Sequence, residues 1–530
     1  MQKQEIRRQI IFGILSVIYA ICLVFGHDIM LYYEDGIQYT SLSVWMRVAL
    51  WAAILFFALN IACIAVTKIW RGGGKSWVTV HCFTVSDGKF FWMIAGIIFV
   101  SYMPTYIACY PGLGIYDGPC QLGLLTTHHP VIHTFFIRFC EKFAGWLHLT
   151  SWLVPYSLIQ MCIFICCLAY AVLCLKRFAF SKIYICLITA WICLFPMNAL
   201  MSITSTKDTF FASLFLLLIC ELGKILYNQE DYFNGERKRY HCIRYSIICF
   251  LMCAFRNNGV YVLIGMLPIT AVCVKNHWKK IVELTLIIIM GYFVYSGPLM
   301  DVAGIPQGDK KEALTVIIQP IVRTYHWRNS ELQEEDKEAI RRLFGGVDPW
   351  YESHISDPPK SQFNTDVFFD NLGLYMRLYC KLGIEFPKEY ADALLANTYG
   401  NWYPHEILPD DTCYRFYFEF PEITPEEYGS KLPGYYIFLQ KLGRESSYLK
   451  VPFLYLFFCT GIVFWIILFL IGVIVIRKEY RKFMCFAPAV FLFITILLGP
   501  VALLRYTYPL VVSVPILTGY TFSTELAVHR

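Results

Sequence analysis

Asp117 is the acidic residue whose sequence context most suggests chemistry. It is the only acid in the segment YPGLGIYDGPCQ, residues 110–121, whose Gly and Pro residues predict a rigid turn. A carboxylate in such a loop can remove a proton from a hydroxyl group or bind a divalent cation. The structural alternative is a turn residue whose side chain bonds its own backbone.

Three histidines, His128, His129 and His133, follow this loop. If a helix begins after Pro130, His129 and His133 share one helical face, a spacing that zinc sites use. No Glu lies between them as in metalloprotease motifs. We therefore favour His128 and His129 as ligands of phosphate or sugar hydroxyls, beside a helix over residues 131–148 that lies along the membrane interface.

Four further motifs place polar residues beside apolar segments. They are Lys207 and Asp208 in STKD, Arg256 and Asn257 in FRNNG, Arg505 and Tyr506 in RYTYP, and Glu312, Gln319 and Arg323 in EALTVIIQPIVR. Charges beside membrane spans are costly and are often functional, although Lys207 and Arg505 could equally be interfacial anchors. Together, cations on one membrane face would suit the phosphate of a lipid.

The composition predicts that membrane helices position these residues. Of the 530 residues, 57% are hydrophobic and only 16% are charged, against about 25% charged residues in soluble proteins. This excludes a soluble or disordered chain, and the net charge of +6 carries no indication of a nucleic-acid partner. The predicted main partner of the chain is the lipid bilayer.

Apolar stretches near the length of a membrane helix predict an all-α polytopic protein with about twelve transmembrane helices. The predicted spans are residues 9–26, 44–67, 89–109, 152–175, 183–200, 208–227, 245–256, 259–274, 281–300, 451–476, 483–503 and 508–523. Three regions follow: a membrane domain over 1–300 with the outer loop 110–150, an extracytoplasmic domain over 301–450, and three C-terminal helices over 451–530.

Lys and Arg are concentrated in alternate loops, which predicts orientation by the positive-inside rule. Both termini are then cytoplasmic in a multi-pass protein of the plasma membrane, and residues 301–450 are extracytoplasmic. This segment is polar and acidic, and the pattern predicts helices over 331–344 and 386–398. The candidate residues fall on the outer side.

These motifs, together with HHP, ISDPPK and NTYGNWYP, resemble those of the GT-C superfamily of membrane glycosyltransferases, and more closely a group of uncharacterised bacterial GT-C-like proteins. The resemblance implies a helical bundle that transfers a sugar from a polyprenyl-phosphate donor to an extracytoplasmic glycan, lipid or protein. It implies that Asp117 is the base or, with His129, a ligand of Mg²⁺ or Mn²⁺, and that Arg505 binds the donor phosphate. The chain departs from many members in having a single acid in the loop.

Two other functions are compatible with the sequence. A secondary transporter or lipid-linked glycan flippase would explain many spans and the break near Arg256. A polymerase or ligase of lipid-linked polysaccharide would also need outer Arg and His residues, but no catalytic carboxylate. The role of Asp117 separates this last function from a glycosyltransferase.

Overall fold

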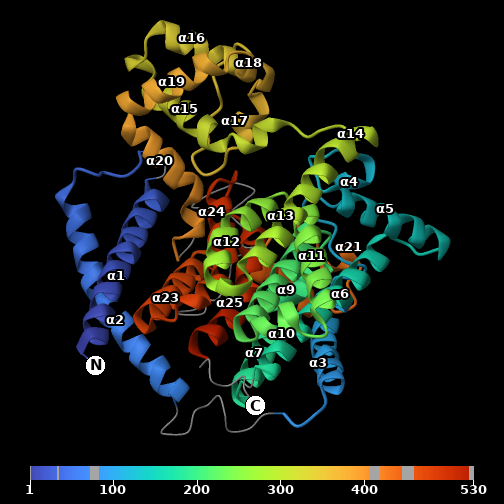
Figure 1. The fold of residues 1–530 in the computed structure, drawn as a ribbon. Helices are drawn as coiled ribbons and strands as arrows, with labels where there is room; N and C mark the ends of the chain where they lie inside the picture. The colour runs from blue at the N-terminus through green and yellow to red at the C-terminus, as the bar shows by residue number, and fades with distance from the viewer. Residues whose placement is uncertain are drawn as a thin grey trace.

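The computed structural model describes residues 2–32, 35–71, 83–178, 180–404, 418–443 and 459–523. These residues form helices joined by turns (Figure 1), and the only β pairing among them is two isolated bridges. The predicted all-α class is therefore confirmed for the described part of the chain. The predicted helix over 451–476 lies partly outside it.

Seven helical stretches of the described residues are long and apolar enough to cross a membrane, or eight if one bent pair counts as a single span. They are α1 (Gln2–Leu31), α2 (Leu42–Arg71), α3 (Asp87–Ala108), α6 (Leu153–Arg177), α9 (Lys207–Tyr227), the stretch Asn258–Val302, and Tyr480–Leu497. The chain is thus an all-helical membrane protein, whereas the predicted number of twelve spans is not confirmed.

The lower count has local causes. The predicted span 183–200 is divided into α7 (Lys182–Leu194) and α8 (Pro196–Ile203), which are bent by 56° at a proline. The spans predicted at 259–274 and 281–300 correspond to α12 (Asn258–Val274) and α13 (Trp278–Val294), two helices that pack against each other. They are counted as one stretch because only the 3₁₀ turn Lys275–His277 separates them.

Three further predicted spans correspond to helices that are too short or not apolar enough to be counted among the seven. They are α11 (Lys238–Phe255), α23 (Gly461–Arg477) and α25 (Leu504–Phe522). Helix α23 has 17 residues, and polar side chains interrupt the other two. All three pack within the bundle, so their neighbours compensate for the polar positions.

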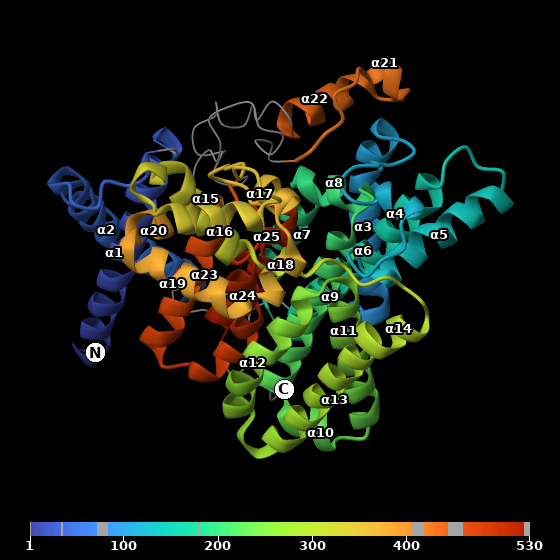
Figure 2. The ribbon, with the colours of Figure 1, turned by 90° about the horizontal axis from the view of Figure 1, so that it is seen from above.

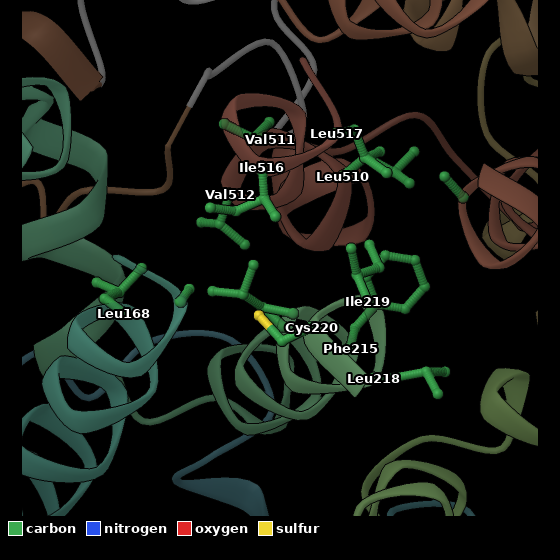
Figure 3. Close-up of a cluster of buried hydrophobic side chains, with 14 of the residues drawn as sticks. Leu168, Phe215, Leu218, Ile219, Cys220, Leu510, Val511, Val512, Ile516 and Leu517 are labelled. Carbon is green, nitrogen blue, oxygen red and sulfur yellow. The ribbon is translucent and has the colours of Figure 1, made fainter. Parts of the chain in front are cut away.

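Helix α9 lies at the centre of the bundle, against α6, α11 and α25. Figure 3 shows Phe215 and Ile219 of α9 facing Leu510 and Val512 of α25 across a buried apolar layer. In lipid, helices associate through close packing rather than through the hydrophobic effect. Gly223 permits this approach, because a Cβ there would collide with the ring of Tyr520.

Six helices of the segment 301–450 form a unit with its own apolar core at one end of the bundle (Figure 1). They are α15 (Thr315–Trp327), α16 (Glu334–Leu343), α17 (Asp357–Gln362), α18 (Thr365–Asp370), α19 (Leu372–Glu385) and α20 (Pro387–Thr398). The helices predicted over 331–344 and 386–398 are confirmed as α16 and α20.

The rest of this segment differs from the predicted single domain. Trp402 and Tyr403 pack against α1, and α22 (Pro433–Gly443) packs against α3 with the short α21 (Pro425–Tyr428), well away from α16 and α19 (Figure 2). The physical reason is that these parts carry aromatic side chains that complete the core of the membrane bundle. Residues 405–417 and 444–450 lie outside the described part.

The opposite end of the bundle gathers basic residues from segments that are distant in sequence. Arg7 donates to the carbonyl of Ile476, and Lys482 donates to the carbonyls of Thr521 and Ser523. In Figure 1 the N-terminal end of α1 lies at this end, away from α15–α19. Side chains that the positive-inside rule assigns to one side thus share one end of the fold, while the orientation in a membrane stays a prediction.

Candidate functional site

Three side chains from segments far apart in the sequence meet at the end of the bundle that carries α15–α20. The Nζ atom of Lys207 lies 2.9 Å from Oδ2 of Asp117, and Nη1 of Arg505 lies 3.3 Å from the same oxygen. Asp117 comes from the loop before α4 (Cys120–Gly123), Lys207 from the first turn of α9, and Arg505 from the first turn of α25. We call these three residues the charge triad.

The backbone around residues 203–206 positions two members of the triad. Leu113 forms a parallel bridge with Thr204, with Leu113 N donating to Ile203 O at 3.0 Å. Helix α9 begins directly afterwards, because the Thr206 hydroxyl accepts from the Asp208 amide as an N-cap. The Asp117 loop and the start of α9 are therefore held by one short pairing.

A second ion pair lies next to the triad. Nη1 of Arg256 donates to Oδ1 of Asp208 at 2.6 Å, and the Asp208 side chain is fully buried. The Arg256 guanidinium lies 4.5 Å from the centre of the Tyr506 ring, and the Arg505 guanidinium lies 5.1 Å from it. Tyr506 thus links the two pairs through cation–π contacts. Asn257, the next predicted residue, accepts a hydrogen bond from Tyr292.

The histidines divide between the site and the core. Nδ1 of His129 lies 3.5 Å from Nζ of Lys207, and the rings of His128 and His129 are 4.7 Å apart. His133 instead points into the core, where its two ring nitrogens bond Gln121 and Tyr156. Helix α5 (Val131–Trp146) begins after Pro130, as predicted, and extends outward from the bundle (Figures 1 and 2). His129 precedes it, so the two histidines do not form a zinc pair.

The cations of the triad control ionisation around Asp117. Burial alone would raise the pKa of this carboxyl, but Lys207 and Arg505 outweigh that effect and hold the pKa well below its usual range. Burial lowers the pKa of His129 to about 4, and the charge of Lys207 adds to this effect. At neutral pH the site therefore holds a carboxylate, two cations and an uncharged imidazole.

The residues of the triad do not fit Mg²⁺ or Mn²⁺. Such ions require several oxygen ligands, whereas Asp117 is a single carboxylate whose Oδ2 already accepts from two cations. Among the described residues, no group of three or more His, Cys, Asp or Glu side chains could hold a metal ion. Asp117 and His129 alone therefore do not provide a site for such an ion.

The arrangement suits an anion with several oxygen atoms. Within the described part of the chain, the buried Nε atom of Arg505 has no hydrogen-bond partner, and an unpaired buried donor costs about 1–3 kcal/mol. A phosphate oxygen would satisfy it through the planar guanidinium. His129 and Asn257, together with side chains of α12 and α13, line a pocket of about 270 Å³, whose lining does not include the three triad residues.

Sequence reasoning did not identify two parts of the site. The Arg505 guanidinium lies 4.7 Å from the centre of the Tyr116 ring, and Tyr116 adopts a positive φ of 58°. In the sequence, the position of Tyr116 directly before Asp117 was the signal that could have identified it. Gln121 donates to the Asp117 carbonyl and bonds His133, a contact for which the sequence held no signal.

Three predicted residues lie elsewhere. Glu312 falls in a 3₁₀ turn before α15 and pairs with Lys360. Gln319 donates to the carbonyls of Glu352 and Ile355, and Arg323 pairs with Glu389. Glu312 does not share a helical face with Gln319 and Arg323, because α15 begins only at Thr315. Gln319 and Arg323 are buried where α15 packs within its own unit.

Asp208→Asn is expected to lower the free energy of unfolding by about 3–5 kcal/mol, because it leaves the Arg256 charge without its buried partner. A thermal unfolding midpoint measured in detergent would detect the change. The double variant Asp208→Asn with Arg256→Gln should recover part of the loss. Equal stability of Asp208→Asn and the wild type would contradict a structural role for this pair.

The fold and site define an all-helical membrane protein with a charge triad at one end of its bundle. The model of a family of unknown function, DUF6020, matches residues 106–526, and the chain belongs to this family. The matched region contains every candidate residue from Asp117 to Tyr506, whereas α1 and α2 precede it. No curated protein and no solved structure shows significant similarity to the chain.

Proposed function

We propose that the protein is a membrane glycosyltransferase that moves a sugar from a polyprenyl-phosphate donor to an extracytoplasmic acceptor. The observation that carries this proposal is the charge triad, in which one carboxylate lies within hydrogen-bond distance of two cations. Arg and Lys together provide a planar fork and a point charge for phosphate. The carboxylate beside them provides a base.

The proposed reaction assigns one task to each member of the triad. Asp117 accepts the proton of the acceptor hydroxyl while that oxygen forms a bond to the anomeric carbon of the sugar. The bond from that carbon to the phosphate oxygen breaks, and its electron pair stays on the polyprenyl phosphate. Lys207 and Arg505 stabilise the charge that develops on this leaving group.

The same contacts explain how the donor would activate the base. While both cations bond Asp117, its lowered pKa makes it a weak base. A phosphate that shares Lys207 and Arg505 adds a negative charge nearby and raises the pKa of the carboxyl. Proton transfer is then favoured only when the donor is bound.

The direct test uses the purified chain in proteoliposomes with a panel of radiolabelled polyprenyl-phosphate sugars. We expect transfer of label to an acceptor in the cell-envelope extract, and retention of a polyprenyl phosphate by the protein in native mass spectrometry. Absence of both across the panel would reject the proposal. A donor with a pyrophosphate link tests the polymerase or ligase function in the same assay.

A transporter or flippase is the second candidate, supported by the bend of 56° between α7 and α8, since transporters use broken helices. Such proteins bind substrates near the bilayer midplane. Here the candidate cations lie instead in the first turns of α9 and α25, and Arg256 directly follows the end of α11. Export of labelled lipid without covalent transfer would favour this candidate.

A further inference from the structure

A group of buried polar side chains outside the charge triad has unpaired atoms. They are Oε1 of Gln319, Nε2 of His354, Oδ1 of Asn397, and both amide atoms of Asn401, none of which has a partner among the described residues. Each side chain belongs to a residue that is at most 9% exposed. We call these four residues the amide cluster. Buried polar atoms are normally hydrogen-bonded, so these atoms are available to bond a ligand.

Three members of the cluster, Gln319, His354 and Asn397, lie next to the segment that leads into α25. Gln319 donates to Ile355 O at 2.6 Å, and Ile355 forms an antiparallel bridge with Val501. Asn397 donates to Gly499 O at 2.9 Å. Arg505 of the charge triad follows Val501 by four residues, so the cluster and the triad are connected by one short stretch of backbone.

An apolar cavity of about 430 Å³ lies beside the chain segment that carries two members of the cluster, Asn397 and Asn401. Side chains of α1, α23 and α24 (Phe483–Leu497) line it, together with Leu395 and Trp402. Leu395 lies two residues before Asn397, and Trp402 directly follows Asn401. The same short segment of chain therefore presents apolar groups to the cavity and amides to the cluster.

The chemistry of the cluster selects an uncharged ligand with hydroxyl groups. Three of its unpaired atoms are amide oxygens, which accept hydrogen bonds, and one is an amide nitrogen, which donates. Burial lowers the pKa of His354 to about 4, so its imidazole is neutral at pH 7. A phosphate would be bound by Arg or Lys, whereas sugar hydroxyls both donate and accept.

We propose that the amide cluster binds the sugar head of a glycolipid whose hydrocarbon chain occupies the adjoining cavity. The role of this glycolipid as the acceptor rests on the proposed function. It also depends on the short stretch of backbone that connects the cluster to Arg505. Binding itself is independent of any transfer. The inference thus assigns the acceptor to a lipid that already carries a sugar.

The test compares three additives to phosphatidylcholine nanodiscs that hold the full chain. They are monoglucosyl diacylglycerol, the same diacylglycerol without sugar, and free methyl glucoside. We expect native mass spectrometry to show preferential retention of the glucolipid, and Asn401→Leu to weaken this retention about tenfold by removing two hydrogen-bonding atoms. Equal retention of both lipids, or unchanged retention by Asn401→Leu, would overturn the proposal.

Stability measurements separate binding from folding. Asn401 has no protein partner among the described residues, so Asn401→Leu should keep or raise the unfolding midpoint. The matched control is Asn198→Leu, which removes bonds to Ile192 and Tyr508 and should lower it. If Asn401→Leu does not fold, His354→Phe removes one unpaired nitrogen instead and should also weaken retention.

Two further measurements complete the test. Asp117→Asn should still retain the glucolipid, so loss of transfer with preserved retention would leave the binding site established even if the transferase assignment failed. Retention by the wild type with no transfer to the glucolipid would instead reject its role as the acceptor. A high-resolution map with only ordered water at the cluster would overturn the glycolipid proposal.

Discussion

Asp117→Asn is expected to lower the turnover of sugar transfer by about 10²–10⁴-fold, the range that a general base contributes. The amide is nearly isosteric with the carboxylate but cannot accept the proton of the acceptor. It also removes the negative charge that Lys207 and Arg505 now neutralise. The apparent KM for the donor should therefore stay constant or fall, because both cations become available to phosphate.

The measurement is a steady-state assay over a range of donor concentrations, with the unfolding midpoint as a check on folding. Asp301→Asn is the matched control, since Asp301 is exposed and bonds Gln307 outside the triad. It should leave both kinetic parameters unchanged. Full turnover by Asp117→Asn would remove the catalytic assignment and favour a function that needs no carboxylate.

Arg505→Lys is expected to raise the apparent KM for the donor about 10- to 100-fold, the effect of losing a charge-assisted hydrogen bond. Lysine keeps the positive charge but lacks the planar fork, the Nε donor and the stacking on Tyr116 and Tyr506. Turnover should fall as well, because the leaving phosphate is less well stabilised.

Arg138→Lys provides the control for this exchange, because Arg138 lies on the outward-projecting α5 and not at the triad. Direct binding of a polyprenyl phosphate, measured by native mass spectrometry, should weaken in Arg505→Lys and not in Arg138→Lys. If both variants bind the lipid as the wild type does, Arg505 is a structural partner of Asp117 and not a phosphate ligand.

Some of the site could be predicted from the sequence because charges are rare in this chain. Asp117, Lys207 and Arg505 each follow or precede an apolar stretch, so the alternation of loops was enough to assign them to one face. The same reasoning grouped Arg323 with them, although Arg323 pairs with Glu389 inside another unit. Helical spacing indicates which face a residue occupies, but not what that face contacts.

The amide cluster shows which part of the structure the sequence could not predict. His354, Asn397 and Asn401 are ordinary polar residues in the sequence, and the sequence grouped Gln319 only with Glu312 and Arg323, not with them. Their burial depends on how α15 and α20 pack together and on contacts with the segment 499–501. Unpaired atoms are a property of the packed structure alone.

The sequence by itself determined that this protein is helical and uses lipid as its solvent, because composition and apolar length are local properties of the chain. Only the tertiary structure decided which charges meet. Asp117 and Arg505 are separated by 388 positions and Asp117 and Lys207 by 90. Such contacts depend on the packing of α9 against α25 and on the pairing of Leu113 with Thr204, which no local pattern specifies.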